Sequence, residues 1–219
     1  MRYWKAFITI VLLTWVSRTK ADNLTVDPVS MKVGETKEVG IILLNPTNQY
    51  VAFQFDIDLP DGITIVDNDA GEPDITLNEE RICGHTLTVI KKGSNQYGIL
   101  AYSFPVATFE GIDGALVYMT LKAEEKISEE ALPMLIKSQV FTAKSGDEYK
   151  WTDISSAITV ETNPGDANGD GVIDQMDIKA SVNYIMTGIA EGFYFQNADI
   201  SGDKVVNVAD IVEIVKIIK

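Results

Sequence analysis

The sequence predicts a mainly β protein with a small α module: an antiparallel β-sandwich followed by two loop–helix units. Three observations predict this fold class. Apolar and polar residues alternate with a period of two through the first two thirds of the chain. Clusters of Gly, Pro, Asn and Asp separate the alternating segments. Near the C-terminus, a 12-residue acidic segment occurs twice.

The alternation is clearest where Phe53, Phe55, Ile57 and Leu59 are separated by polar residues. A strand with this pattern has one buried face and one solvated face. Residues 117–121 alternate in the same way, and further segments bring the expectation to about eight or nine strands, as in an antiparallel sandwich. These further segments are residues 24–26, 38–44, 86–90, 98–104, 135–142 and 157–160.

Several short motifs follow one another along this region. They are Val33-Gly34-Glu35, Gln54-Phe55-Asp56-Ile57, Leu59-Pro60-Asp61-Gly62, Gly98-Ile99-Leu100-Ala101-Tyr102, Asp113-Gly114-Ala115-Leu116-Val117 and Ala157-Ile158-Thr159-Val160. Because these motifs occur in this order, residues 22–160 resemble the cohesin-like sandwich of bacterial extracellular scaffolding and carbohydrate-binding proteins. That sandwich is a jelly roll. The resemblance implies a binding domain.

The composition excludes several classes of function. The chain has 18 Lys and Arg against 32 Asp and Glu, and four of the basic residues lie in its first 21 positions. Such an acidic chain is unsuited to phosphate contacts, so we expect no nucleic-acid binding. A single Cys83 and a single His85 exclude an internal disulfide and leave little room for Ser-His-Asp or Cys-His catalysis. We expect both to be ordinary sandwich residues.

The first 21 residues are typical of a secretory signal peptide. Arg2 and Lys5 precede an apolar segment at residues 6–16, and a polar stretch ends in the small residue Ala21, after which we expect cleavage. The apolar segment is shorter than the roughly 20 residues of a transmembrane helix, although an uncleaved anchor is an alternative. We therefore expect a secreted, periplasmic or cell-surface protein without a membrane span after cleavage.

The strongest pattern is the repeat, in which the segment that starts at Asp166 recurs 33 residues later at Asp199. Side-chain oxygens at loop positions 1, 3, 5, 9 and 12, with a backbone carbonyl at position 7, are the spacing that wraps Ca²⁺. All seven Asp residues after position 162 lie in these loops, and their mutual repulsion is unfavourable without a cation. The predicted ligands are Asp166, Asn168, Asp170, Val172, Asp174 and Asp177 in the first loop, and Asp199, Ser201, Asp203, Val205, Asn207 and Asp210 in the second.

The second loop departs from the pattern at two positions. Position 6 is usually Gly because the turn is sharp, and here it is Lys204. A Lys with positive φ is strained by about 1 kcal/mol. Position 3 is Ser201, a neutral and weaker ligand. We therefore expect two calcium sites, of which the second is weaker.

Each loop leads into a helical segment with an apolar stripe. The stripes comprise Ile178, Val182, Ile185 and Met186 after the first loop, and Ile211, Ile214, Val215 and Ile218 after the second. Two such helices can bury their stripes against each other. Each loop–helix unit is half of an EF-hand, often called an F-hand.

The register, the Asp at position 12, the following Ile and the duplication resemble the dockerin family, whose units bind Ca²⁺ and dock on cohesins. The resemblance covers residues 166–219. It implies that positions 10 and 11 of each loop, namely Gln175, Met176, Val208 and Ala209, contact the partner. Several dockerins have Ser or Thr pairs there, which leaves the type of partner open. The same residues can equally pack internally or against the sandwich.

Together these patterns predict a signal peptide at 1–21, a sandwich at 22–160, a linker at 161–165 and a dockerin-like module at 166–219. The leading interpretation is an exported, non-catalytic calcium-binding adaptor in an extracellular polysaccharide-handling assembly. Its expected partner is a cohesin-like or other extracellular domain. Alternatively, the dockerin-like module binds the sandwich of its own chain or of a neighbouring chain.

Carbohydrate binding is a second interpretation, in which the dockerin-like part serves as an anchor. Tyr149 and Trp151 are two residues apart, so a strand places both on one face where they can stack on a glycan. Their alternative role is packing under a neighbouring loop. A glycoside hydrolase is a third interpretation, but no catalytic domain remains once both parts are assigned.

Overall fold

The computed structural model describes residues 21–82, 84–124 and 131–218. The predicted export signal lies outside this part of the chain except for Ala21, and Cys83 lies outside it too. Within the described residues, no helix has both the length and the apolar character needed to cross a bilayer.

The first of two sheets has five strands in the order β1-β3-β9-β5, with β6 also paired to β9. The strands are β1 (Asn23–Val26), β3 (Thr36–Leu44), β5 (Ile63–Ile65), β6 (Ile75–Leu77) and β9 (Asp113–Ala123). All of these pairs are antiparallel. The long strands β3 and β9 hold the sheet together, since every other strand pairs with one of them.

The second sheet has seven strands in the order β2-β12-β10-β4-β8-β7, with β11 also paired to β10. The strands are β2 (Val29–Lys32), β4 (Tyr50–Asp58), β7 (Thr86–Lys91), β8 (Gln96–Tyr102), β10 (Ala131–Ala143), β11 (Glu148–Lys150) and β12 (Ile154–Glu161). Register shifts along the central β4–β10 pair between Lys137 and Val140, where Ser138 has a φ of 53°. This geometry is that of a β-bulge.

The mainly β sandwich agrees with the predicted fold class, but two details differ. The described residues form twelve strands rather than eight or nine. The additional strands β2, β5, β6 and β11 have only three or four residues each, which is too short for an alternating pattern to be recognised. In addition, β2 and β12 pair in parallel within a sandwich that the sequence predicts to be antiparallel.

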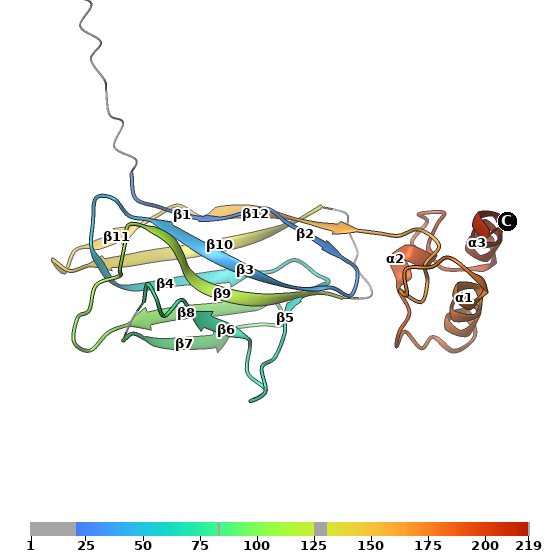
Figure 1. Cartoon of the computed structure of the whole chain (residues 1–219), viewed down its shortest axis with the longest axis horizontal. Helices are drawn as coiled ribbons and strands as arrows, with labels where there is room; N and C mark the ends of the chain where they lie inside the picture. The colour runs from blue at the N-terminus through green and yellow to red at the C-terminus, as the bar shows by residue number, and fades with distance from the viewer. Residues whose placement is uncertain (1–20, 83, 125–130, 219) are drawn as a thin grey trace, which may run out of the picture.

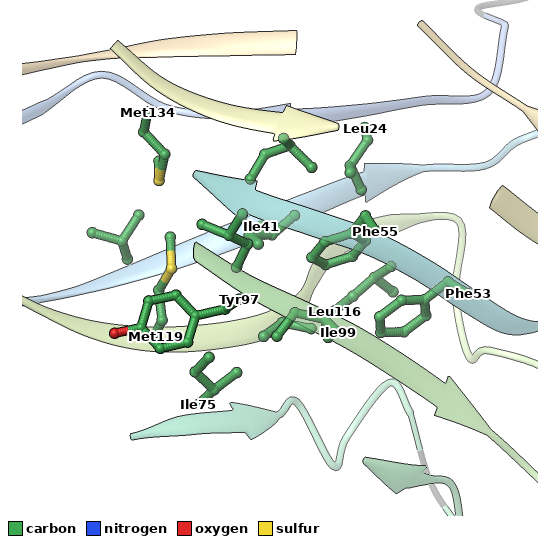
Figure 2. Close-up of a cluster of buried hydrophobic side chains, with 14 of the residues drawn as sticks. Leu24, Ile41, Phe53, Phe55, Ile75, Tyr97, Ile99, Leu116, Met119 and Met134 are labelled. Atoms are coloured by element: carbon green, nitrogen blue, oxygen red, sulfur yellow. The ribbon is translucent and has the colours of Figure 1, made fainter. Parts of the chain in front are cut away.

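The core lies between the two sheets, and the alternation predicted for residues 53–59 is confirmed. Phe53, Phe55 and Ile57 are buried while Gln54 is exposed. Figure 2 shows Phe53 and Phe55 within the cluster that also contains Leu116. The rings of Phe53 and Phe55 stack with their centroids 5.3 Å apart. Each such side chain contributes about 1.5–3 kcal/mol by burial.

A buried arginine connects strands β3 and β9 with the loop between β8 and β9. Arg81 is only 4% exposed. Its guanidinium donates to the carbonyl oxygens of Leu43, Glu110 and Gly114 and to the side-chain oxygen of Asn45. Burial lowers the pKa of Arg81, and the charge of Asp113 acts in the opposite direction. The planar guanidinium therefore donates to three backbone carbonyls and one side-chain oxygen at once.

The C-terminal region contains α1 (Gln175–Thr187), α2 (Phe195–Ala198) and α3 (Val208–Ile218). Figure 1 shows this helical region beyond one end of the sandwich, to which β12 leads. Its own core is small and is extended by Tyr184, whose ring stacks on Phe193 at 4.3 Å. The buried members of that core are Ala167, Phe193, Ala198 and Val206.

The prediction that the two helices bury their apolar stripes against each other is wrong for α1. Val182, Ile185 and Met186 are all exposed, and Met186 is 77% exposed. The buried residues of α1 are Asp177 and Ser181 instead. Helix α3 fits the prediction better, because Ile214 is fully buried.

Candidate metal centre and docking surface

Hydrogen bonds within the first loop fold it around its own carboxylates. Asp166 Oδ2 accepts from the backbone N–H of Gly171 at 3.0 Å. Asn168 Oδ1 accepts from the N–H of Asp170 at 2.9 Å, and Asp170 Oδ1 accepts from that of Val172 at 2.8 Å. The predicted ligands at positions 1, 3, 5 and 7 of the loop are thus linked in one compact turn.

The last two predicted ligands of the first loop also start α1. Asp174 is the N-cap residue, and its Oδ1 accepts from the N–H of Met176 at 2.6 Å. Asp177 is completely buried, and its two oxygens accept from the N–H groups of Asn168 and Asp174. This is a capping box, with a carboxylate in the favourable field of a helix N-terminus. The same residues therefore close the loop and start the helix.

The second loop repeats this geometry, so the repeat in the sequence is a repeat in structure. The oxygens of the buried Asp210 accept from the N–H groups of Ser201 and Asn207 at 3.0 and 2.9 Å. Asn207 Oδ1 accepts from the N–H of Ala209 at 2.8 Å and caps α3 as Asp174 caps α1. Asp203 Oδ1 accepts from the N–H of Val205 at 2.9 Å.

The two loops differ at position 1. Asp199 Oδ1 accepts from the Ser201 hydroxyl at 3.2 Å and from the Gly202 N–H at 2.9 Å. In contrast, Asp166 Oδ1 is buried and has no hydrogen-bond partner among the described residues. A buried carboxylate oxygen without a donor is costly, and a bound cation would satisfy it. The donor set of hard oxygens fits Ca²⁺.

Among the residues that the structure describes, no three His, Cys, Asp or Glu side chains converge as a metal cluster. The predicted ligand sets are mixed, because each includes an amide or hydroxyl oxygen and a backbone carbonyl. In addition, Asp170, Asp177 and their counterparts accept hydrogen bonds from amides of their own loops. In the described structure, the carboxylates of each loop are therefore bonded to the backbone of their own loop and are not gathered around one point.

Lys204 has a φ of 68°, which confirms the left-handed backbone expected at position 6 of the second loop. Gly171, its counterpart in the first loop, has a φ of 86°. We expect Lys204→Gly to stabilise the helical region by up to about 1 kcal/mol, because the left-handed backbone strains Lys but not Gly. Thermal unfolding in calcium measures this gain, and Gly171→Ala should shift the transition in the opposite direction. A lower melting temperature for Lys204→Gly would contradict strain at this position.

The predicted docking residues all lie on the surface, in or next to the first turns of α1 and α3. Gln175, Met176, Val208 and Ala209 are exposed, Met176 by 51% and Val208 by 67%. The alternative that these residues pack internally is therefore not what the structure shows. Each loop therefore has an exposed apolar side chain at one of its two predicted docking positions, Met176 at position 11 of the first loop and Val208 at position 10 of the second, and both are available for a partner.

Tyr149 and Trp151, the candidate glycan-stacking pair, are partly buried against the sandwich core. Trp151 stacks on Phe141 at 4.3 Å, and both Tyr149 and Trp151 meet the Tyr50 ring edge-on at 86°. The Tyr149 hydroxyl donates to Asn48 Oδ1 at 3.1 Å. This arrangement favours the packing role over an exposed stacking platform. His85 contacts the Val51 carbonyl at 3.1 Å.

Sequence reasoning missed three residues beside the first loop. Asn197 is 5% exposed, and its amide donates to the Asp166 carbonyl at 2.9 Å and accepts from the N–H of Asn163 at 2.9 Å. Tyr194 accompanies them, with its N–H bonded to the Ala167 carbonyl. These residues lie outside the repeated motif and outside any periodic segment, so no pattern marked them.

Residues 164–219 match the family model described as the dockerin type I domain. The C-terminal part of the chain is therefore a dockerin type I domain, and such domains typically bind calcium. No protein of curated function matches the chain.

Solved structures of cohesin modules match the sandwich. The cohesin module of a Clostridium perfringens family 33 glycoside hydrolase has 16% identity and a TM-score of 0.52, covering 65% of this chain and 98% of that module. A non-cellulosomal cohesin from Archaeoglobus fulgidus has 11% identity and a TM-score of 0.52, and the match covers 65% of this chain and 92% of that cohesin. CaCohA2 from Clostridium acetobutylicum has 16% identity and a TM-score of 0.53, and the match covers 63% of this chain and 88% of CaCohA2. The N-terminal region thus has a cohesin-like fold.

Proposed function

We propose that this chain, which ends in a dockerin type I domain, is an exported, non-catalytic adaptor of an extracellular polysaccharide-handling assembly. It binds calcium at two loops and docks on a cohesin-like domain through the surface around Met176 and Val208. The single observation that carries the proposal is the exposure of these two apolar side chains where the two calcium-type loops run into α1 and α3. The dockerin family match and the cohesin-like fold of the sandwich support it.

The loops prepare the docking surface through the residues that they share with the helices. Asp174 and Asn207 cap the helices, while Asp177 and Asp210 join each loop to its helix. Calcium, when bound, supplies the positive charge that offsets the repulsion among these carboxylates. The ion would be held by the side-chain oxygens at positions 1, 3, 5, 9 and 12 and the carbonyl of Val172 or Val205. Ordering of the loops then fixes the first turns of α1 and α3.

The sandwich of another copy is the alternative partner. It has exposed apolar side chains at Ile90 of β7, Leu100 of β8 and Phe104 just after β8. Strands β7 and β8 are neighbours in the sheet, which brings Ile90 and Leu100 close to each other. Such a patch is suited to bind an apolar helix surface. A binding experiment should therefore include the chain itself as a candidate partner.

We expect Met176→Asp and Val208→Asp each to weaken docking by about tenfold or more, because a charge at the centre of an apolar interface must be desolvated. The full chain would be titrated calorimetrically against type I cohesin domains, and sedimentation velocity would detect docking between copies. Ile112→Asp is the matched control, since Ile112 is an exposed apolar residue of the sandwich, on the loop before β9. Binding that persists in chelator, or that both Asp variants leave unchanged, would contradict the proposed docking surface.

A further inference from the structure

The ring of Tyr194 fills the space between the sandwich and the first calcium-type loop. A Cβ atom added at Gly34, in the turn between β2 and β3, would lie 2.6 Å from Tyr194 Cε1 and 2.8 Å from its hydroxyl oxygen. A Cβ atom added at Gly169, position 4 of the first loop, would lie 2.1 Å from Tyr194 Cε2. Real Cβ atoms essentially never come closer than 3.0 Å to another atom. A side chain at either position would therefore displace the Tyr194 ring.

The second loop has no such contact. Gly202 is the counterpart of Gly169 in the repeat, with nearly the same φ, 72° against 73°. A Cβ atom at Gly202 would meet nothing within 4 Å in the part of the chain that the structure describes. Of these two glycines, only Gly169 therefore lies against a neighbouring ring in the part of the chain that the structure describes, although both have nearly the same backbone.

A cavity of about 490 Å³ lies beside this contact. Its lining combines Lys32, Val33 and Glu161 of the sandwich with Asp166, Gly171 and Asn197 of the dockerin domain. Asp166 is the predicted ligand at position 1, and its Oδ1 is the buried oxygen without a hydrogen-bond partner among the described residues. Residues of the sandwich and of the first calcium-type loop therefore line the same cavity.

The connection between the domains is also held by hydrogen bonds. β12 extends to Glu161, whose Oε1 accepts from the Ser30 hydroxyl at 2.6 Å. Two residues later, the Asn163 side chain donates to Asp166 Oδ2 at 3.0 Å. The N–H of Gly165 then donates to the Asn197 carbonyl at 2.7 Å. The segment that the sequence indicates as a linker is thus bonded to both domains.

We propose that Tyr194 is the joint that fixes the dockerin domain on the sandwich, and that calcium in the first loop tightens this joint. The proposal rests on the calcium binding proposed above. An ion held by Asp166 orders the loop that carries Gly169, and this loop forms one wall around the Tyr194 ring. Because such coupling is reciprocal, the sandwich in turn raises the calcium affinity of the first loop.

Gly34→Ala tests the joint from the sandwich side, far in sequence from every predicted calcium ligand. Its matched control is Gly71→Ala, because Gly71 has a φ of 76° against 77° at Gly34 and an added Cβ there meets nothing within 4 Å among the described residues. Both variants impose the same backbone strain, and only Gly34→Ala displaces Tyr194. Gly169→Ala and Gly202→Ala form a second matched pair, which serves if Gly34→Ala fails to fold.

The distance between the domains would be measured in the full chain by pulsed electron paramagnetic resonance. Spin labels would be attached to cysteines introduced by Ser145→Cys in the sandwich and Glu191→Cys in the dockerin domain, with Cys83→Ser to remove the native thiol. We expect a narrow distance distribution in calcium for the parent and for Gly71→Ala. We expect a broad one in chelator for both, and a broad one for Gly34→Ala even in calcium. Calcium titration should show at least about fivefold weaker binding at the tighter site in Gly34→Ala.

The outcomes separate this inference from the proposed function. If calcium binds and Gly34→Ala leaves the distance distribution as narrow as in Gly71→Ala, the joint is overturned and the docking function stands. If calcium binds but its removal changes no distance, the coupling is overturned. If the chain binds no calcium, both proposals fail.

Discussion

Removal of calcium from the full chain is expected to unfold residues 164–219 and to leave the sandwich folded. The loops gather seven Asp residues, and Asp177 and Asp210 are completely buried. Without a cation, their repulsion opposes folding. When metal ligands come together only on folding, the free energy of metal binding becomes free energy of folding. A site saturated at about a thousand times its Kd contributes about 4 kcal/mol.

The small size of the dockerin domain makes this contribution decisive. Its buried apolar cluster consists of Ala167, Phe193, Ala198 and Val206, which is far smaller than the sandwich core. Domains of this length have little apolar core of their own and commonly need metals or disulfides. Two calcium ions supply free energy comparable to the whole stability expected for such a domain. The sandwich, in contrast, gains nothing from these ions directly.

Two signals distinguish the domains in one experiment. Trp151 is the only tryptophan after position 21 and packs in the sandwich, so its fluorescence follows that domain. The helical circular dichroism signal follows α1 and α3. Chelator should abolish the helical signal at room temperature and leave the Trp151 transition close to its original temperature. A helical signal that survives chelation would contradict a folding role of calcium.

A pair of variants should rank the two loops. Asp177→Asn and Asp210→Asn each replace the buried carboxylate at position 12, which accepts two backbone hydrogen bonds in both loops. We expect Asp177→Asn to remove the tighter calcium-binding step and Asp210→Asn the weaker one, because Lys204 and Ser201 already weaken the second loop. The reverse order in a calcium titration would show that the strain at Lys204 does not control affinity.

The loops were the most predictable part of the molecule, because their geometry is local. The left-handed backbone at Lys204 follows from its position within the 12-residue repeat. The long strands were predictable for a similar reason, since strict alternation over five or more residues is typical of a half-buried strand. Short strands such as β5 form only because a neighbour such as β9 offers free backbone groups, and no local pattern records that.

The helical stripe of α1 shows a different limit. Periodicity indicates that Val182, Ile185 and Met186 share one side of the helix, but it does not say what covers them. In this chain Tyr184 stacks on Phe193 and Ser181 is buried, so another side of α1 faces the small core. An apolar stripe for a partner and an apolar stripe for a core look the same in a sequence.

Residues whose role depends on contacts with distant parts of the chain could not be recognised from the sequence. Gly34 and Tyr194 are far apart in the sequence, and only the tertiary structure brings them into contact. Arg81 follows Glu79 and Glu80 and is, from the sequence, an ordinary surface charge. Its burial depends on where β3, β9 and the loop before β9 meet.

Arg81→Met is expected to destabilise the sandwich by about 3–5 kcal/mol, a large fraction of the stability of a domain. Methionine fills much of the volume but donates no hydrogen bond. The carbonyl oxygens of Leu43, Glu110 and Gly114 would lose their side-chain donor, and a buried polar group without a partner costs about 1–3 kcal/mol. Urea unfolding followed by Trp151 fluorescence measures the effect.

The matched comparison is with Arg81→Lys, which keeps the charge but loses the planar fork that reaches several acceptors at once. We expect Lys to recover only part of the lost stability, because a single ammonium cannot replace donors from Nε, Nη1 and Nη2 together. If Lys restored nearly full stability, charge rather than hydrogen-bond geometry would be the main contribution of Arg81. If Met cost less than about 1 kcal/mol with an unchanged denaturant slope, the carbonyls would have other donors, and the packing of β3, β9 and the loop before β9 would not depend on this guanidinium.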